Sequence, residues 1–172
     1  MKVIFLDIDG VLVNRKSLAD MGGMRAKADP RCVEALNAIT DATGAKIVVS
    51  STWRCYPPPD FETPTDYMRA KMREWGVRGE VIGCTPDLAK ESLACRGIYV
   101  GAERGDEIQA WLDRNATVGD EVESFVILDD DSDMKHLTDR LIKATMQHGL
   151  LLDDAERAQR MLGVDTRMVV AA

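Results

Sequence analysis

The sequence predicts one α/β domain, built from a mainly parallel sheet with helices on both faces. Short apolar runs typical of buried strands alternate along the chain with stretches of helical periodicity. Strands that alternate with helices are joined by right-handed crossovers, so their carboxyl ends meet at one edge of the sheet. Three of the apolar runs end in polar residues, in the sequences LDID, VSST and LDDD. The fold therefore predicts a polar pocket assembled from segments far apart in the sequence.

Each expected element has its own signal in the sequence. Apolar runs predict strands at 3–6, 46–50, 81–84, 124–128 and 141–145. Apolar residues at helical spacing predict helices at 30–43, 65–75, 106–114 and 153–162, with a short helix after Asp133. For the first helix, Asp29 is the expected N-cap, Pro30 lies in the first turn and Gly44 ends it.

Composition limits the class of protein. A chain of 172 residues is long enough for one domain with its own core, which we expect to span residues 1–172. The four cysteines lie far apart and have no neighbouring histidine at zinc spacing, so neither a zinc site nor a dense disulfide framework is expected. No run of 18 apolar residues occurs. We therefore expect a cytoplasmic protein that does not span a membrane.

The distribution of charge is more informative than its sum. The net charge of −7 argues against a chain-wide surface for nucleic acid or for an anionic membrane. Acidic residues crowd into 120–133, whereas 14–31 contains five basic and two acidic residues. The first segment is suited to a cation, and the second could receive an anion.

Two carboxylates follow the first predicted strand, in the stretch VIFLDIDGVL at 3–12. Crowded carboxylates repel one another unless they hold protons or a cation, and oxygen ligands of this kind suit Mg²⁺. A carboxylate nucleophile beside such a metal permits phosphoryl transfer through an aspartyl phosphate. In that chemistry Asp7 attacks the phosphorus, while Asp9 protonates the leaving oxygen and later activates water.

A phosphate also needs room and hydrogen-bond donors. Gly10 lets the chain turn sharply and leaves space for a phosphate to approach the backbone. Hydroxyl groups after the second strand and a fixed positive charge supply the donors. The hydroxyls available are Ser50 and Ser51, and because adjacent strand residues point in opposite directions, only one of them faces the site.

These residues resemble a known family. DIDGV, the serine after the second strand and ILDDDSD are similar, in order and spacing, to three motifs of the haloacid dehalogenase (HAD) superfamily. More narrowly, SSTWR, TPDL followed by RGDEIQAWL, and LDDDSDM resemble small bacterial and phage phosphatase-like domains related to those of nucleic-acid repair proteins. The resemblance implies a three-layer Rossmann-like fold with a minimal cap and a magnesium-dependent phosphatase activity.

The resemblance assigns roles to residues of the first and last acidic motifs. It makes Asp7 the nucleophile, and Asp9 the acid/base whose backbone carbonyl binds Mg²⁺. It places Asp130 in the metal site, together with Asp129 or Asp133.

The resemblance also assigns the phosphate-binding groups. Ser50 is the expected phosphate-binding hydroxyl, with Ser51 as the alternative. The third motif of the family is a lysine about 25 residues before the acidic pair, the length of one crossover. Arg104 stands in that place, and Lys90 is its rival. Arginine and lysine bind phosphate differently, so this position departs from the family pattern.

The site is expected to be open. Residues 11–29 form a loop too short for a separate cap domain, and we expect it to act as a flap. An open site favours a substrate whose own bulk excludes water. Trp53 and Arg54 are expected at its rim, where an indole stacks on a base and a guanidinium binds a phosphate. Further candidates for recognition lie in the basic loop, at Arg15, Lys16, Arg25 and Lys27.

The sequence thus predicts a Mg²⁺-dependent phosphatase whose substrate is a nucleotide or a polynucleotide 3′-phosphate end. A phosphorylated small metabolite or phosphoprotein is an alternative substrate. A catalytically silent binding or scaffold domain of the same fold is the alternative function, because Arg104 replaces the family lysine. A second copy of the chain could serve as a cap, so a homo-oligomer is compatible with both.

Overall fold

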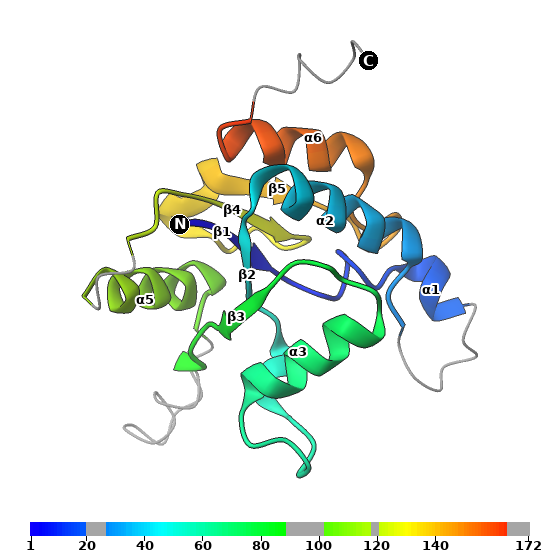
Figure 1. The fold of residues 1–172 in the computed structure, drawn as a ribbon, viewed down its shortest axis with the longest axis horizontal. Helices are drawn as coiled ribbons and strands as arrows, with labels where there is room; N and C mark the ends of the chain where they lie inside the picture. Colours follow the sequence, from blue (N-terminus) through cyan, green and yellow to red (C-terminus); the bar gives the residue numbers. More distant parts are fainter. Residues whose placement is uncertain (20–26, 89–101, 118–120, 165–172) are drawn as a thin grey trace.

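A five-stranded parallel sheet forms the centre of the protein (Figure 1). The structure is a computed structural model and describes residues 1–19, 27–88, 102–117 and 121–164. The strand order is β3-β2-β1-β4-β5. The strands are β1 (Lys2–Leu6), β2 (Lys46–Val49), β3 (Val81–Cys84), β4 (Ser124–Asp129) and β5 (Leu141–Lys143). The predicted α/β, Rossmann-like fold is confirmed.

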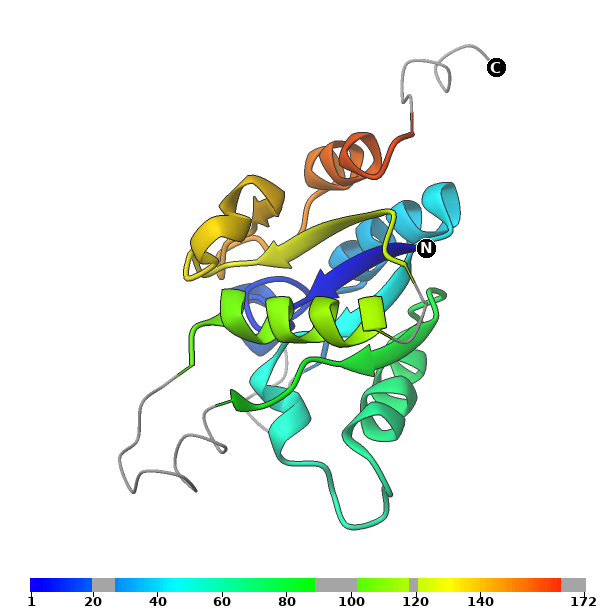
Figure 2. The same cartoon turned by 90° about the vertical axis from the view of Figure 1, so that its left-hand side faces the viewer.

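Helices cover both faces of the sheet. The α-helices are α1 (Arg15–Ala19), α2 (Pro30–Thr43), α3 (Pro64–Glu74), α5 (Arg104–Thr117) and α6 (Leu152–Met161), and the 3₁₀ helices are η1 (Thr52–Cys55) and η2 (Lys135–Arg140). Side chains alternate along β1, so Ile4 and Leu6 pack in one core with α2, α3 and α6. Val3 and Phe5 pack in a second core with α5 and η2. Figure 2 shows α5 lying across the second face.

The predicted elements agree with the structure except at a few ends. Helix α2 has the predicted N-cap, because Asp29 accepts a hydrogen bond from the Arg31 amide, and it ends at Gly44 with a left-handed φ of 66°. Helix α5 begins two residues earlier than predicted, because the side chain of Asp133 accepts a hydrogen bond from the Arg104 amide at its start. The sequence analysis missed the short helices α1 and η1.

None of the described helices is long and apolar enough to cross a membrane.

The chain turns tightly after β1. The carbonyl of Ile8 accepts hydrogen bonds from the amides of Val11, Leu12 and Val13, at 3.2, 2.9 and 2.9 Å. Gly10 adopts a φ of 77° inside this turn, a conformation that glycine reaches without strain. The turn leads the chain away from the sheet into 11–29. The flap role of 11–29 stays a prediction, since residues 20–26 lie outside the described part of the chain.

A buried asparagine holds the two ends of 11–29 together. Asn14 Nδ2 donates to Asp29 Oδ2 at 3.0 Å and to the carbonyl of His148 at 3.1 Å. Asn14 Oδ1 accepts from the Ser17 amide at 3.0 Å. Hydrogen bonds from Arg31, and secondarily from Asn14, hold the pKa of Asp29 well below its usual value. This network fixes where the chain leaves the turn after β1 and where it enters α2.

Asn14→Ala removes these bonds and leaves buried polar groups unpaired. We expect the free energy of unfolding to fall by about 2–3 kcal/mol. Denaturant titration measures the change. The matched control is Asn115→Ala, since Asn115 is half-buried and donates one described hydrogen bond, to the carbonyl of Trp111 at 2.8 Å. Equal losses in the two variants would contradict the role given to Asn14.

Candidate catalytic and metal-binding site

Three carboxylates meet at the carboxyl ends of β1 and β4. Leu6 pairs with Leu128 in the parallel ladder, and the amide of Asp7 donates to the carbonyl of Leu128 at 2.9 Å. Asp7 and Asp129 therefore leave neighbouring strands side by side. Oxygen atoms of Asp7, Asp129 and Asp130 all lie within 4.8 Å of one another. The first and last acidic strand endings therefore come together, as the sequence predicts.

Burial raises the free-energy cost of ionising the carboxyl groups of this cluster. Loss of solvent is the main cause that raises the pKa of Asp7 to about 6, against the lowering effects of the Ser51 hydroxyl and the Arg104 charge. Burial and the charge of Asp7 raise the pKa of Asp129 to about 7. Burial and the charge of Asp131 raise the pKa of Asp130. The cluster therefore holds protons near neutral pH unless a cation replaces them.

The donor set fits Mg²⁺. Magnesium prefers carboxylate oxygens over nitrogen or sulfur ligands, and all three side chains supply oxygen. Asp129 Oδ2 is buried and accepts no hydrogen bond from any described residue. Its nearest described cation is Arg104, whose Nε is 3.7 Å away. A buried carboxylate oxygen left in this way is what a metal ligand offers before the metal binds.

Gly10 makes room for a carboxylate. A Cβ added at this glycine would overlap the side chain of Asp130. We expected the space above Gly10 to admit a phosphate to the backbone. On the side where a Cβ would stand, this space is filled by the carboxyl group of Asp130, so a phosphate contact at Gly10 stays a prediction. Gly10 acts by allowing Asp130 to join the cluster.

Asp9 stands apart from the three clustered side chains. It is half-buried, and its Oδ2 accepts a hydrogen bond from Nε1 of Trp53 at 2.9 Å. The indole of Trp53 packs edge-on against Trp75, with ring centroids 5.4 Å apart and planes at 71°. Trp53 was expected at the rim as a stacking surface, and its bond to Asp9 was missed. The available signal was an indole N–H placed at a strand end, where a buried donor needs an acceptor.

Two buried hydroxyls follow β2. The side chain of Ser51 approaches Asp7 closely enough to lower its pKa, whereas the backbone amide of Ser50 continues the sheet ladder by donating to the carbonyl of Leu6 at 2.8 Å. Neither Oγ has a hydrogen bond of good geometry within the described residues. The sequence favours Ser50 as the phosphate ligand, but the structure brings Ser51 to the nucleophile.

Arg54 is a structural residue, and its predicted place at the rim is wrong. Its side chain is only 4 % exposed and donates to the carbonyls of Ser51, Thr85 and Pro86 at 2.7, 2.9 and 3.0 Å. Nη2 also forms an ion pair with Oε2 of Glu107 at 2.6 Å. A guanidinium occupied in this way has no free fork for a phosphate.

Arg104 supplies positive charge at the edge of the cluster. It is the first residue of α5, and its Nη1 donates to Oε2 of Glu107 at 3.1 Å. Its charge lowers the pKa of both Asp7 and Asp129. Lys90, the rival for this role, lies outside the described residues. The carboxylate of Asp133 caps α5 and lies outside the group of three, so the cluster contains Asp129 in its place.

The basic loop and a hollow lined by arginines lie outside the carboxylate cluster. Within the basic loop, Arg15, Lys16 and Lys27 are exposed, Arg15 Nη1 donates to Gln147, and Arg25 lies outside the described residues. The hollow lies between the end of α3 and the start of β3, at the amino ends of the strands.

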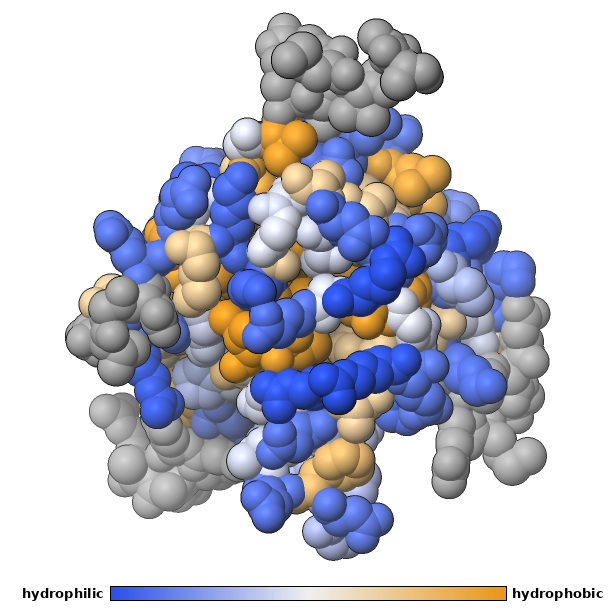
Figure 3. All heavy atoms as spheres, viewed as in Figure 1, coloured by the Kyte–Doolittle hydropathy of each residue, from blue (hydrophilic) through white to orange (hydrophobic). Residues whose placement is uncertain are grey.

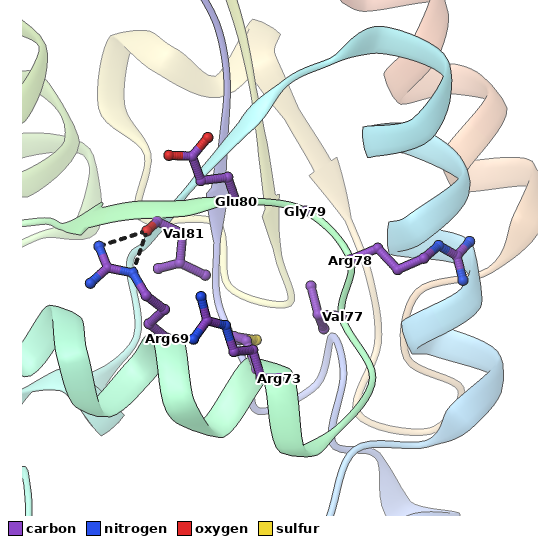
Figure 4. Close-up of a pocket in the computed structure, with 8 residues that line it drawn as sticks. Arg69, Arg73, Val77, Arg78, Gly79, Glu80 and Val81 are labelled. Atoms are coloured by element: carbon purple, nitrogen blue, oxygen red, sulfur yellow. Dashed lines mark hydrogen bonds between the residues drawn. The ribbon is translucent and has the colours of Figure 1, made fainter.

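Arginines line this hollow, which has a volume of about 550 Å³ (Figure 4). Arg69 pairs with Asp66, and Arg78 pairs with Glu34 and Asp41. Figure 4 shows Arg78 turned toward α2 and away from Arg69. In Figure 3, the face seen in the view of Figure 1 carries hydrophilic side chains with hydrophobic atoms between them. Two of the three guanidinium charges that line this hollow are therefore compensated by carboxylates.

Arg54→Ala leaves the buried Glu107 without one of its two cations. We expect the free energy of unfolding to fall by about 3–5 kcal/mol. Arg78→Ala is the matched control, because Arg78 also contacts two acidic residues but is half exposed, and we expect a loss of less than about 1 kcal/mol. Denaturant titrations measure both losses. A loss in Arg54→Ala no larger than that in Arg78→Ala would contradict the structural role of Arg54.

The raised pKa values predict a pH dependence of stability in EDTA. Between pH 4 and 7 the folded state keeps protons on Asp7 and Asp129 that the unfolded chain has released. Their contribution to stability is therefore present at low pH and is lost as pH rises through about 6 and 7. We expect the melting temperature to fall from pH 5 to 8, and Mg²⁺ to restore it.

Asp129→Asn should weaken this dependence, because the amide carries no charge at pH 8. Asp139→Asn is the matched control, since Asp139 is exposed and does not belong to the cluster, and it should retain the dependence of the wild type. An Asp129→Asn curve that falls as steeply as the wild-type curve in EDTA would contradict the assignment.

One comparison with known proteins identifies the family. A family model described as the HAD domain in Swiss Army Knife RNA repair proteins matches residues 3–155. This range contains the carboxylate cluster, the two serines, Trp53 and Arg104. It confirms the resemblance to the haloacid dehalogenase superfamily and to its nucleic-acid repair members. The chain belongs to the family of HAD domains found in Swiss Army Knife RNA repair proteins.

Proposed function

We propose that the protein is a Mg²⁺-dependent phosphomonoester hydrolase that works through an aspartyl phosphate on Asp7. The observation that carries the proposal is the cluster of three carboxylates at the ends of β1 and β4, with two raised pKa values and an arginine beside it. Phosphoryl transfer needs such a place, where a cation and a fixed positive charge balance the charge of the phosphate.

The proposed reaction has two steps. An oxygen of Asp7 attacks the phosphorus, the bond to the leaving oxygen breaks, and the carboxyl group of Asp9 donates its proton to that oxygen. The Asp9 carboxylate then takes a proton from water, whose oxygen attacks the same phosphorus. The bond to Asp7 breaks, which releases inorganic phosphate and restores both aspartates. Trp53 acts as a positioning residue, because its N–H fixes one oxygen of Asp9.

The remaining groups would balance the negative charge of the phosphate. Held by Asp7, Asp129, Asp130 and the backbone carbonyl of Asp9, Mg²⁺ would neutralise the phosphate and keep Asp7 ionised. Ser51 and Ser50 would donate their unused hydroxyls to phosphate oxygens. Arg104 takes the role of the family lysine, with its head drawn toward the cluster between Glu107 and Asp129.

The proposed substrate is a phosphate on a nucleotide or on the 3′ end of a polynucleotide. The matching family is named for RNA repair proteins, which favours a substrate that belongs to a nucleic acid. The net charge of −7 opposes long contacts along a phosphate backbone and favours contacts limited to an end. A cytoplasmic location agrees with this substrate class.

Phosphate release from a panel of monoesters tests the proposal. The panel contains mononucleotides, a 3′-phosphorylated oligonucleotide, a phosphopeptide and an aryl phosphate, each with Mg²⁺ or EDTA. We expect turnover only with Mg²⁺, and a loss of roughly a thousandfold or more in Asp7→Asn. Asp9→Asn should accumulate protein that carries a phosphoryl group, detected by intact mass, because the second step lacks its base.

Asp139→Asn is the control variant and should keep the wild-type rate, since its side chain is exposed and lies outside the cluster. Absence of release from every substrate by the folded, Mg²⁺-loaded wild type would overturn the proposal. That result would favour the silent binding domain instead.

A further inference from the structure

A pocket beside the catalytic carboxylates has no part in the chemistry above. It has a volume of about 490 Å³ and lies between the loop after η1 and the helix α3. This loop and helix form the lower part of the molecule in Figures 1 and 2. The walls of this aromatic pocket include Trp53, Phe61, Tyr67, Lys71 and Glu74. Its volume is in the range of pockets that bind small ligands.

Trp53 joins the aromatic pocket to the catalytic centre. Its Nε1 contacts Asp9, while its ring forms part of the pocket wall. One indole therefore separates the carboxylate that handles the leaving-group proton from the interior of the pocket. In a nucleotide, one sugar ring separates the phosphate from the base. A phosphate held at Asp7 can thus direct its own base toward the pocket.

The walls of the pocket offer aromatic surface. The rings of Phe61 and Tyr67 have centroids 5.3 Å apart and planes inclined at 59°, and both side chains are half-buried. Each ring therefore keeps part of its surface free for a third ring. Trp75 packs edge-on against Trp53 and holds it in place. Nucleobases stack on such surfaces with little dependence on sequence.

The charges at the pocket cancel. Lys71 Nζ forms an ion pair with Oε2 of Glu74 at 2.9 Å, and both residues line the pocket. A wall without net charge favours a neutral heteroaromatic ring over a second phosphate. The pair also offers a donor and an acceptor to the edge of that ring.

We propose that the aromatic pocket binds the single unpaired base of the nucleotide that carries the scissile phosphate. The proposal rests on the proposed function for its phosphate, and it names the recognised part of the substrate. Stacking of this kind contributes about 1–3 kcal/mol per base. Recognition of the last nucleotide alone agrees with the acidic net charge, because it requires no long basic surface.

Two dinucleotide 3′-phosphates, identical except that one lacks its terminal base, test the pocket. We expect the wild type to show a higher kcat/KM for the substrate with the base, by roughly 5- to 150-fold. Tyr67→Ala and Phe61→Ala should reduce this ratio toward one, because each removes part of the aromatic wall. Tyr56→Ala is the matched control, an exposed tyrosine of the same loop that does not line the pocket.

Binding to the Asp7→Asn protein separates failure of the pocket from failure of the proposed function. Titration with each dinucleotide, followed by tryptophan fluorescence, requires no turnover. The pocket is upheld, even if nothing is hydrolysed, by two results together. Asp7→Asn binds the dinucleotide with the base more tightly, and the double variant Asp7→Asn/Tyr67→Ala binds both dinucleotides equally. Equal affinity of Asp7→Asn for both dinucleotides would overturn the proposal. The proposal would also be overturned if the wild type formed a dimer at micromolar concentration and Tyr67→Ala were a monomer. The pocket would then hold a second copy of the chain.

Discussion

The repulsion among Asp7, Asp129 and Asp130 is the constraint around which the rest of the molecule is arranged. Parallel strands deliver the first two side by side, and the backbone turn at Gly10 opens the space for the third. In a buried place such a group is stable only with protons or a cation. The sheet sets the positions of the carboxylates, and their mutual repulsion favours binding of protons or of a cation.

Positive charge reaches the cluster through a short chain of ion pairs. Arg104 lies between Asp129 and Glu107, and Glu107 in turn pairs with Arg54. One carboxylate therefore bridges two guanidinium groups that come from η1 and α5. The arrangement keeps Arg104 beside the carboxylate cluster without letting it neutralise the cluster fully, since its Nε remains 3.7 Å from Asp129 Oδ2.

The fold and the acidic cluster could be predicted because both follow from short-range patterns. An apolar run followed by carboxylates marks the end of a buried strand, and parallel connections bring such ends together. The partners of Arg54 and Trp53 could not be predicted in this way. Glu107 lies 53 residues after Arg54, and Trp53 reaches back 44 residues to Asp9, so each contact depends on how whole elements pack. The filling of the Gly10 space by Asp130 depends on a side-chain direction that no local pattern fixes.

Arg54 also joins the two ends of an excursion of the chain. Its guanidinium holds the carbonyls of Thr85 and Pro86, where the chain leaves β3, and Glu107, where α5 has just begun. The ends of the interval at 87–103 are thus fixed independently of what lies between them. Because the entropy of closing a loop grows only slowly with its length, chain can be added there at little cost. Chain added between these two anchored ends, during evolution or by design, would therefore leave the carboxylates in place.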